Sequence, residues 1–147
     1  MAFRKILLLT DFSPEATRAF GPTAELARRL NAEIILLHVV YDPGVAPGVA
    51  FAAPKAVPDI GDWVAKAKTG LAEHRALLPA DLTVRADLVA SHHVPEAAVA
   101  YARERDCDLI ALSTHGRTGF RRVVMGSIAE AVVRQSSTPV LLLPRQE

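Results

Sequence analysis

Five short runs of aliphatic residues constrain the fold of this chain more than any other feature of its sequence. The runs are Ile6–Leu9, Ile34–Val40, Val84–Val89, Leu109–Leu112 and Val140–Leu143. Several of them are continuous, with no alternation, which is typical of strands that are buried on both faces of a parallel sheet. The segments between the runs have helical periodicity. Alternating strands and helices predict right-handed crossovers and therefore an α/β fold, a doubly wound parallel sheet with helices on both faces.

The segment after the first run has the signals of a helix at both ends. Ser13 suits the N-cap, Pro14 the first helical position and Glu15 the first turn. Asn31 suits a left-handed residue that ends the helix. The expected buried face of this helix consists of Ala16, Ala19, Phe20, Thr23, Ala24, Ala27 and Leu30.

Three further helices are expected, and one long loop. The second helix should span 62–78, and the third should start near Pro95. The fourth should start at Ser127, because Ser127 and Glu130 have the spacing of a capping box. The segment 42–61 is rich in proline and glycine, and we interpret it as a long surface loop. A structureless loop of more than about 12–15 residues tends to be functional or mobile.

Composition narrows the class of protein. The 147 residues are 50% hydrophobic and 22% charged, with a net charge of +1, so we expect one folded domain over 1–147. The absence of a basic excess argues against a domain dedicated to nucleic acid. The run Ile6–Leu9 is too short for a signal peptide, and no run approaches the roughly 18 residues that cross a bilayer, so we expect a cytoplasmic protein.

Cys107 is the only cysteine, which excludes a disulfide or a multi-cysteine zinc site within one chain. Its acidic neighbours Asp106 and Asp108 disfavour a thiolate, so a nucleophilic role is not expected. His92, His93 and His115 have no spacing that predicts a metal site.

Polar residues follow three of the predicted strands. The first strand ends in Thr10-Asp11, the second in His38-Val39-Val40, and the fourth in Ser113-Thr114-His115-Gly116. In doubly wound sheets ligands bind beyond the carboxyl ends of the strands, where the strand order reverses. These strand ends are therefore the expected ligand site.

The loop after Ser113 has the composition of an anion site. It contains Gly116 and Gly119, followed by a predicted helix start at Gly126–Ser127, and its arginines are Arg117, Arg121 and Arg122. Glycines allow backbone N–H groups to approach phosphate oxygens, and a helix N-terminus supplies further donors. Equally, the glycines could only turn the chain and Ser127 only cap the helix. The chain contains no GxxxxGK[ST], no GxGxxG after the first strand and no GxSxG.

Six segments together resemble the universal stress protein family over essentially the whole chain. They are Lys5–Ser13, Leu36–Val39, Asp108–Leu112, Thr114–Gly119, Met125–Glu130 and Thr138–Leu141. The resemblance implies a single domain with a five-stranded parallel sheet, of the kind found in adenine nucleotide alpha hydrolases. It also implies a homodimer that is joined through the last strand, Val140–Leu143.

One branch of that family binds ATP through the pattern G-x2-G-x9-G-[ST]. In this chain Gly116 matches the second glycine and Gly126–Ser127 the end of the pattern, whereas Ser113 stands at the first glycine. A serine there costs about 1–2 kcal/mol if the position needs a positive φ, and nothing otherwise. The resemblance implies that Asp11 lies near the nucleoside and that the backbone of Val39 meets adenine.

The nucleotide-binding residues expected from this resemblance are Thr10, Asp11, Val39, Ser113, Gly116, Arg117, Gly119, Gly126, Ser127 and Ile128. The expected ligand is ATP, or AMP or ADP, with Mg²⁺ carried by the nucleotide. Asp11 has a second interpretation, in which it binds backbone groups at the strand end. His38 is interpreted as a core histidine with its hydrogen bonds satisfied, and Tyr41, Trp63 and Tyr101 as packing residues.

Three functions remain open on the sequence. The first is a regulatory ATP-binding protein with at most slow hydrolysis, because no general base or Walker-type lysine is evident and no catalytic residue is assigned. The second is a dimerisation module that works without nucleotide through protein partners. The third is an adenylating enzyme, which would need a serine- and glycine-rich loop after the first strand; residues 10–14 do not form one. Neither nucleic acid nor a membrane is an expected partner.

Overall fold

Each of the five aliphatic runs forms a strand, and helices lie between the strands. The computed structural model describes residues 2–43, 60–115 and 125–144. Its elements are β1 (Lys5–Leu9), the 3-10 helix η1 (Ala16–Ala19), α1 (Phe20–Leu30), β2 (Glu33–Tyr41), α2 (Ile60–Ala76), β3 (Val84–Ser91), α3 (Val94–Glu104), β4 (Leu109–Ser113), α4 (Ser127–Gln135) and β5 (Val140–Leu143).

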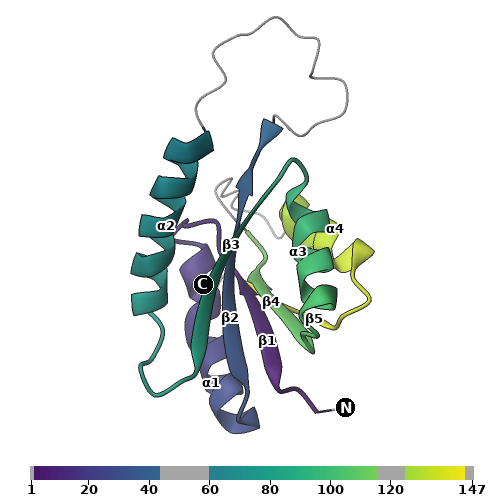
Figure 1. Ribbon diagram of the computed structural model, residues 1–147. Coiled ribbons are helices and arrows are strands. Elements are labelled where there is room, and N and C mark those ends of the chain that lie inside the picture. Colours follow the sequence, from purple (N-terminus) through teal and green to yellow (C-terminus); the bar gives the residue numbers. More distant parts are fainter. Residues whose placement is uncertain (1, 44–59, 116–124, 145–147) are drawn as a thin grey trace, which may run out of the picture.

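The strands form one parallel sheet in the order β3-β2-β1-β4-β5 (Figure 1). From the central β1 the chain moves outward through β2 and β3. It then returns to place β4 and β5 on the other side of β1. The strand order therefore reverses between β1 and β4, and the predicted doubly wound α/β fold is confirmed.

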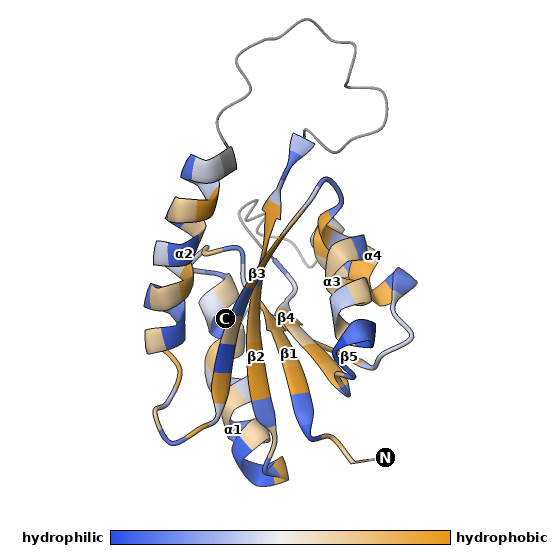
Figure 2. Cartoon of the chain, in the orientation of Figure 1, coloured by the Kyte–Doolittle hydropathy of each residue, from blue (hydrophilic) through white to orange (hydrophobic). Residues whose placement is uncertain are grey.

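Alternating side chains of the central strands build two hydrophobic layers. Ile6 and Leu8 of β1 belong to a cluster with residues of α1 and α2, such as Phe20 and Leu71. Leu7 belongs to a second cluster with residues of α3 and α4. Figure 1 shows these two pairs of helices on opposite faces of the sheet, and Figure 2 shows the apolar strands between them. Burial on both faces explains why the runs are continuous in the sequence.

The first helix starts differently from the prediction. Ser13 Oγ accepts a hydrogen bond from the Ala16 N–H (3.1 Å), as expected of a cap, but the chain then forms the 3-10 helix η1 and only afterwards α1. The reason is local: the Arg18 N–H bonds to the Glu15 carbonyl three residues earlier. Asn31 ends α1 in the left-handed conformation (φ 53°), which confirms that part of the prediction.

The second helix and the predicted loop have different bounds from those expected. The helix α2 begins at Ile60, so residues 60 and 61 are helical, and it ends at Ala76, before the predicted Leu78. Residues 44–59 of the predicted loop lie outside the described part. None of the helices in the described ranges is long and apolar enough to span a membrane.

The capping box predicted for α4 is wrong. The helix starts at Ser127 as predicted, but Gly126 is the N-cap, and none of the described side chains caps this end. The register is set by the Glu130 N–H, which donates to the Gly126 carbonyl (2.9 Å). The Glu130 carboxylate pairs instead with Arg134, one turn further along the helix.

The last strand is only half-buried, whereas its aliphatic run suggests a fully buried strand. The reason is its place in the sheet, because β5 pairs with β4 on one side and is the sheet edge on the other. The opposite edge is β3, which carries exposed Arg85 and partly exposed Asp87. The two edges therefore differ in chemistry: one is aliphatic and the other is charged.

Candidate functional site

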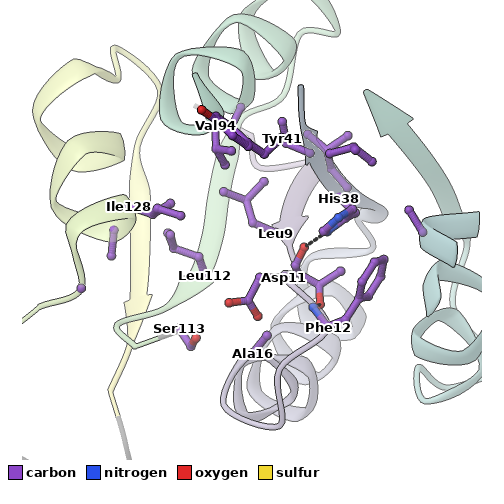
Figure 3. Close-up of a pocket in the computed structure, with 18 of the residues that line it drawn as sticks. Leu9, Asp11, Phe12, Ala16, His38, Tyr41, Val94, Leu112, Ser113 and Ile128 are labelled. Atoms are coloured by element: carbon purple, nitrogen blue, oxygen red, sulfur yellow. Dashed lines mark hydrogen bonds between the residues drawn. The ribbon is translucent and has the colours of Figure 1, made fainter. Parts of the chain in front are cut away.

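A cavity of about 700 Å³ opens at the carboxyl ends of β1, β2 and β4, at the point where the strand order reverses (Figure 3). Seven of the residues expected to bind nucleotide line it: Thr10, Asp11, Val39, Ser113, Gly126, Ser127 and Ile128. The other three, Gly116, Arg117 and Gly119, lie outside the described residues, as do Arg121 and Arg122.

The hydroxyl and carbonyl of Thr10 form hydrogen bonds with other groups of the protein. Its Oγ1 accepts a hydrogen bond from the Phe12 N–H (3.1 Å) and lies 3.1 Å from His74 Nδ1 on α2. Its carbonyl accepts a hydrogen bond from His38 Nδ1 (2.7 Å). Thr10 therefore organises the turn after β1.

Asp11 lines the cavity and also holds the turn. Its Oδ1 accepts a hydrogen bond from the Ser13 N–H (2.9 Å) and another from the Ser13 hydroxyl. Figure 3 shows its carboxylate directed into the space between the ends of β1 and β4. The structure thus confirms the backbone-binding interpretation of this residue and leaves its carboxylate at the cavity.

Phe12 adopts a left-handed conformation (φ 66°), which is uncommon for a residue with a large side chain. Its ring stacks on His38 (centroids 4.0 Å apart) and meets His74 edge-on (5.3 Å). A Cβ at Gly70 of α2 would lie 3.2 Å from the ring. These contacts hold the strained residue in place. His38 has the expected hydrogen bond, but it is half-buried and lines the cavity, so its assignment to the core is wrong.

Val39 lines the cavity, and its peptide group faces the β1 side of the sheet. The pairing of β1 with β2 ends at Leu9 and Leu37, and the last bond between the two chains runs from the Thr10 N–H to the Leu37 carbonyl (3.0 Å). Alternate peptide groups of a strand point to the same neighbour, so the Val39 N–H and carbonyl point toward the β1 side, like those of Leu37. No hydrogen bond joins the Val39 peptide group to β1 or to the described turn that follows it.

Ser113 fits its position without backbone strain. Apart from glycine, the described residues with a positive φ are Phe12, Asn31 and Asp106, so Ser113 has an ordinary φ. Its hydroxyl donates a hydrogen bond to the His115 carbonyl (2.7 Å). The cost considered for a serine at this place therefore does not arise.

Gly126 closes the other end of the cavity. Its N–H donates to the Thr114 carbonyl (2.6 Å), and a Cβ on Gly126 would lie 3.0 Å from that same oxygen. A side chain here would have to push the two backbone segments apart by a few tenths of an ångström, so glycine suits this close approach. The first N–H groups of α4, beginning at Ser127, have no partner within the helix, and the helix dipole favours an anion beside them.

The comparisons with known proteins agree with this arrangement. The model of the universal stress protein family matches residues 2–144. The chain belongs to the universal stress protein family. It is 25% identical to universal stress protein YxiE of Bacillus subtilis over 96% of this chain and 99% of the relative. It is 29% identical to universal stress protein A homolog 1 of Coxiella burnetii over the whole of both chains.

Solved universal stress protein structures have the same fold. UspA of Lactobacillus plantarum superposes with a TM-score of 0.79 at 23% identity, over 97% of this chain and 99% of that one. A universal stress protein in complex with cAMP has a TM-score of 0.65 at 21% identity, over 98% of each chain. One from Archaeoglobus fulgidus in complex with dAMP has a TM-score of 0.64 at 19% identity, over 97% of this chain and 98% of that one.

In this universal stress protein the cavity also contains residues that the sequence did not assign to it. Tyr41, Trp63 and Lys66 line it, so Tyr41 and Trp63 are not simply packing residues. Tyr41 is 54% exposed, whereas Tyr101 is buried as expected. The spacing of Trp63 and Ala67 in the sequence places them on one face of a helix. That spacing does not show that this face covers the cavity, because the position of α2 depends on how the helix packs on the sheet.

Burial shifts the pKa values of two titratable groups, His74 beside the cavity and Cys107 away from it. Burial lowers the pKa of His74 below its usual range, although the charge of Asp11 opposes this shift. Away from the cavity, burial raises the pKa of the Cys107 thiol to about 11, with smaller contributions from acidic neighbours, so this cysteine is an unreactive core residue. The described residues contain no group of three or more potential metal ligands.

Proposed function

We propose that this universal stress protein binds an adenine nucleotide, with ATP as the first choice, in a regulatory role. The observation that carries the proposal is the pair of open main-chain sites at opposite ends of one cavity. The Val39 peptide group lies at one end, and the first N–H groups of α4, which have no partner within the helix, lie at the other. Two relatives of the same fold are complexes with cAMP and dAMP.

The adenine end of the proposed complex lies at Val39. The Watson–Crick edge of adenine carries an acceptor, N1, beside a donor, the N6 amino group. The Val39 N–H and carbonyl present a donor beside an acceptor, which is the complementary order. Asp11, between this end and Ser113, is in a position to accept a hydrogen bond from a ribose hydroxyl.

The phosphate end lies at Gly126, Ser127 and Ile128. Phosphate oxygens accept hydrogen bonds from helix N-termini, and the glycine allows a close approach of the backbone. Arg117 and Gly119 would complete this end. Mg²⁺ would come with the phosphates, because Asp11 is the only carboxylate among the described residues that line the cavity.

A binding function with at most slow hydrolysis suits the lining residues. Among the described ones, Asp11 already accepts two hydrogen bonds at Oδ1, and Lys66 is the only lysine or arginine. The proposal therefore assigns no catalytic residue.

Calorimetric titration with ATP and Mg²⁺ tests this function. We expect saturable binding to the wild-type protein and a loss of binding in Gly126→Val, whose side chain would collide with the Thr114 carbonyl. Gly21→Ala is the matched control, because a Cβ there meets no atom within 4 Å. No saturation by millimolar ATP, together with an unchanged melting temperature, would instead support the nucleotide-independent module.

We also propose a homodimer that pairs through the free edge of β5. An edge strand with aliphatic side chains on both faces leaves backbone donors and acceptors that a second copy can satisfy. This assembly is compatible with either function, and its test is given in the Discussion.

A further inference from the structure

We propose that His38 and Thr10 are positioning residues that keep the Val39 peptide group open. Their side chains form hydrogen bonds with the Thr10 carbonyl and the Phe12 N–H, the two main-chain groups that would otherwise pair with Val39. The identity of the ligand that binds the open peptide group rests on the proposed function. The arrangement of His38, Thr10 and Val39 is independent of that function.

The direction of the peptide groups in β2 follows from its hydrogen bonds. The Glu33 N–H donates to the Arg4 carbonyl (2.9 Å), and the Leu37 carbonyl accepts from the Thr10 N–H, so odd-numbered residues face β1. The Ile34 N–H donates to the Thr83 carbonyl (2.9 Å), so even-numbered residues face β3. Val39 therefore faces β1.

If the parallel ladder continued by one step, Val39 would have two defined partners. Its N–H would donate to the Thr10 carbonyl, and its carbonyl would accept from the Phe12 N–H. Neither bond forms. The Thr10 carbonyl accepts from His38 Nδ1 (2.7 Å; dashed line in Figure 3), and the Phe12 N–H donates to Thr10 Oγ1 (3.1 Å).

The bond from His38 does not depend on its charge. A carbonyl oxygen can only accept, so Nδ1 carries the proton, both in the corresponding neutral tautomer and in the charged ring. Acidification alone therefore does not release the Thr10 carbonyl to Val39.

The bond to Thr10 Oγ1 depends on the unusual backbone of Phe12. The positive φ turns this residue away from an extended strand, and the Phe12 N–H points back to the threonine side chain. The two hydrogen bonds are coupled, because the His38 ring that donates to the Thr10 carbonyl also stacks on the Phe12 ring.

The open peptide group makes base selection a property of the main chain. Adenine presents an acceptor beside a donor, whereas hypoxanthine presents the reverse order on a ring system of the same size, because N1 carries a proton and O6 replaces the amino group. We therefore expect ATP to bind at least about tenfold more tightly than inosine triphosphate.

Amide hydrogen exchange of the nucleotide-free protein tests the geometry directly. In the wild type the Val39 amide should exchange much faster than the ladder-bonded Leu37 amide. In His38→Phe, which keeps a ring against Phe12 but has no donor, the Val39 amide should become protected about tenfold or more. His38→Asn keeps a donor near the Nδ1 position, and its Val39 amide should remain fast.

Thr10 provides an independent pair of variants should the His38 variants fail to fold. Thr10→Val removes the acceptor of the Phe12 N–H, and Thr10→Ser retains it. We expect Thr10→Val to lose the preference for ATP over inosine triphosphate, with ATP affinity reduced about tenfold, and Thr10→Ser to keep both.

The outcomes separate this proposal from the proposed function. If Val39 is fast in the wild type and protected in His38→Phe, but ATP does not bind, the positioning role stands and the function fails. If ATP binds the wild type, but His38→Phe and Thr10→Val change neither the Val39 exchange nor the nucleotide preference, the positioning role is overturned.

Discussion

The single residue Thr23 lowers the stability of the protein at α1. Its side chain is fully buried, and its hydroxyl has no hydrogen-bond partner within the part of the chain that the structure describes. A buried, unpaired hydroxyl carries a desolvation cost of about 1–3 kcal/mol. We expect Thr23→Val, which keeps the shape and removes the hydroxyl, to raise the free energy of unfolding by about 1 kcal/mol.

Urea denaturation measures this change, and Thr23→Ala is the control. The alanine also removes the hydroxyl, but it leaves a void in the core and should destabilise the protein. A Thr23→Val variant that is less stable than the wild type would mean that the hydroxyl has a partner in solution.

His74 should make stability depend on pH. Its pKa in the folded protein lies below the usual 6.5, because burial disfavours the charged ring. The unfolded chain therefore binds the proton at a higher pH than the folded one, and stability falls as the pH drops below about 6.5. We expect denaturation between pH 7 and about pH 5 to show this loss, and His74→Asn, which keeps a polar partner for Thr10, to reduce it. Equal slopes for the two proteins would contradict the assignment to His74.

The predictability of single residues depended on how far their partners lie along the chain. The strand-end positions of Asp11 and Ser113 follow from sequence neighbours, and these residues do line the cavity. The role of His38 depends on the Thr10 carbonyl, 28 positions away, and on the register between two strands. Composition and periodicity carry no signal for such a contact.

At the scale of elements, Asn31 ends α1 and starts the connection to β2. Its left-handed backbone (φ 53°) is strained for most residues but not for glycine. We expect Asn31→Ala to lower the free energy of unfolding by about 1 kcal/mol, whereas Asn31→Gly should leave it nearly unchanged. Thermal denaturation of both variants measures this, and an equal loss in both would point to the asparagine side chain instead of the backbone.

The elements themselves were largely predictable, because burial on both sheet faces produces continuous aliphatic runs. The strands β1, β2 and β4 follow from this pattern, and the beginning of α3 follows from Pro95. The edge strands β3 and β5 also coincide with the aliphatic runs, although both are only partly buried. The errors lie at helix ends: at η1, at the cap of α4 and at both ends of α2, which spans Ile60–Ala76 instead of 62–78. At these places one or two hydrogen bonds choose between alternatives that the sequence supports almost equally.

At the scale of the whole molecule, the free edge of β5 leads to a prediction about assembly. The Thr114 N–H donates to the Leu143 carbonyl, so the peptide groups of Leu141 and Leu143 face β4. The peptide group of Leu142, which lies between them, therefore points outward from the sheet edge. Leu142→Pro removes the outward N–H, and we expect it to be monomeric. Leu142→Ala keeps that N–H and should remain dimeric.

Sedimentation equilibrium distinguishes these states. A wild-type protein that is monomeric at micromolar concentration would contradict a β5 dimer, as would a Leu142→Pro variant that still dimerises. Circular dichroism of both variants controls for the integrity of the sheet.

The early end of the β1–β2 pairing has a consequence for how such a site changes over evolutionary time. A contact made by a peptide group does not depend on the identity of the side chain: at position 39, any residue other than proline that preserves the strand supplies the same N–H and carbonyl. If the Val39 peptide group binds the base as proposed, substitutions at this position that preserve the strand leave base selection intact. Under this proposal the residues that matter are His38 and Thr10, whose hydrogen bonds end the pairing of the two strands, so a shared recognition edge need not appear as one residue type at position 39.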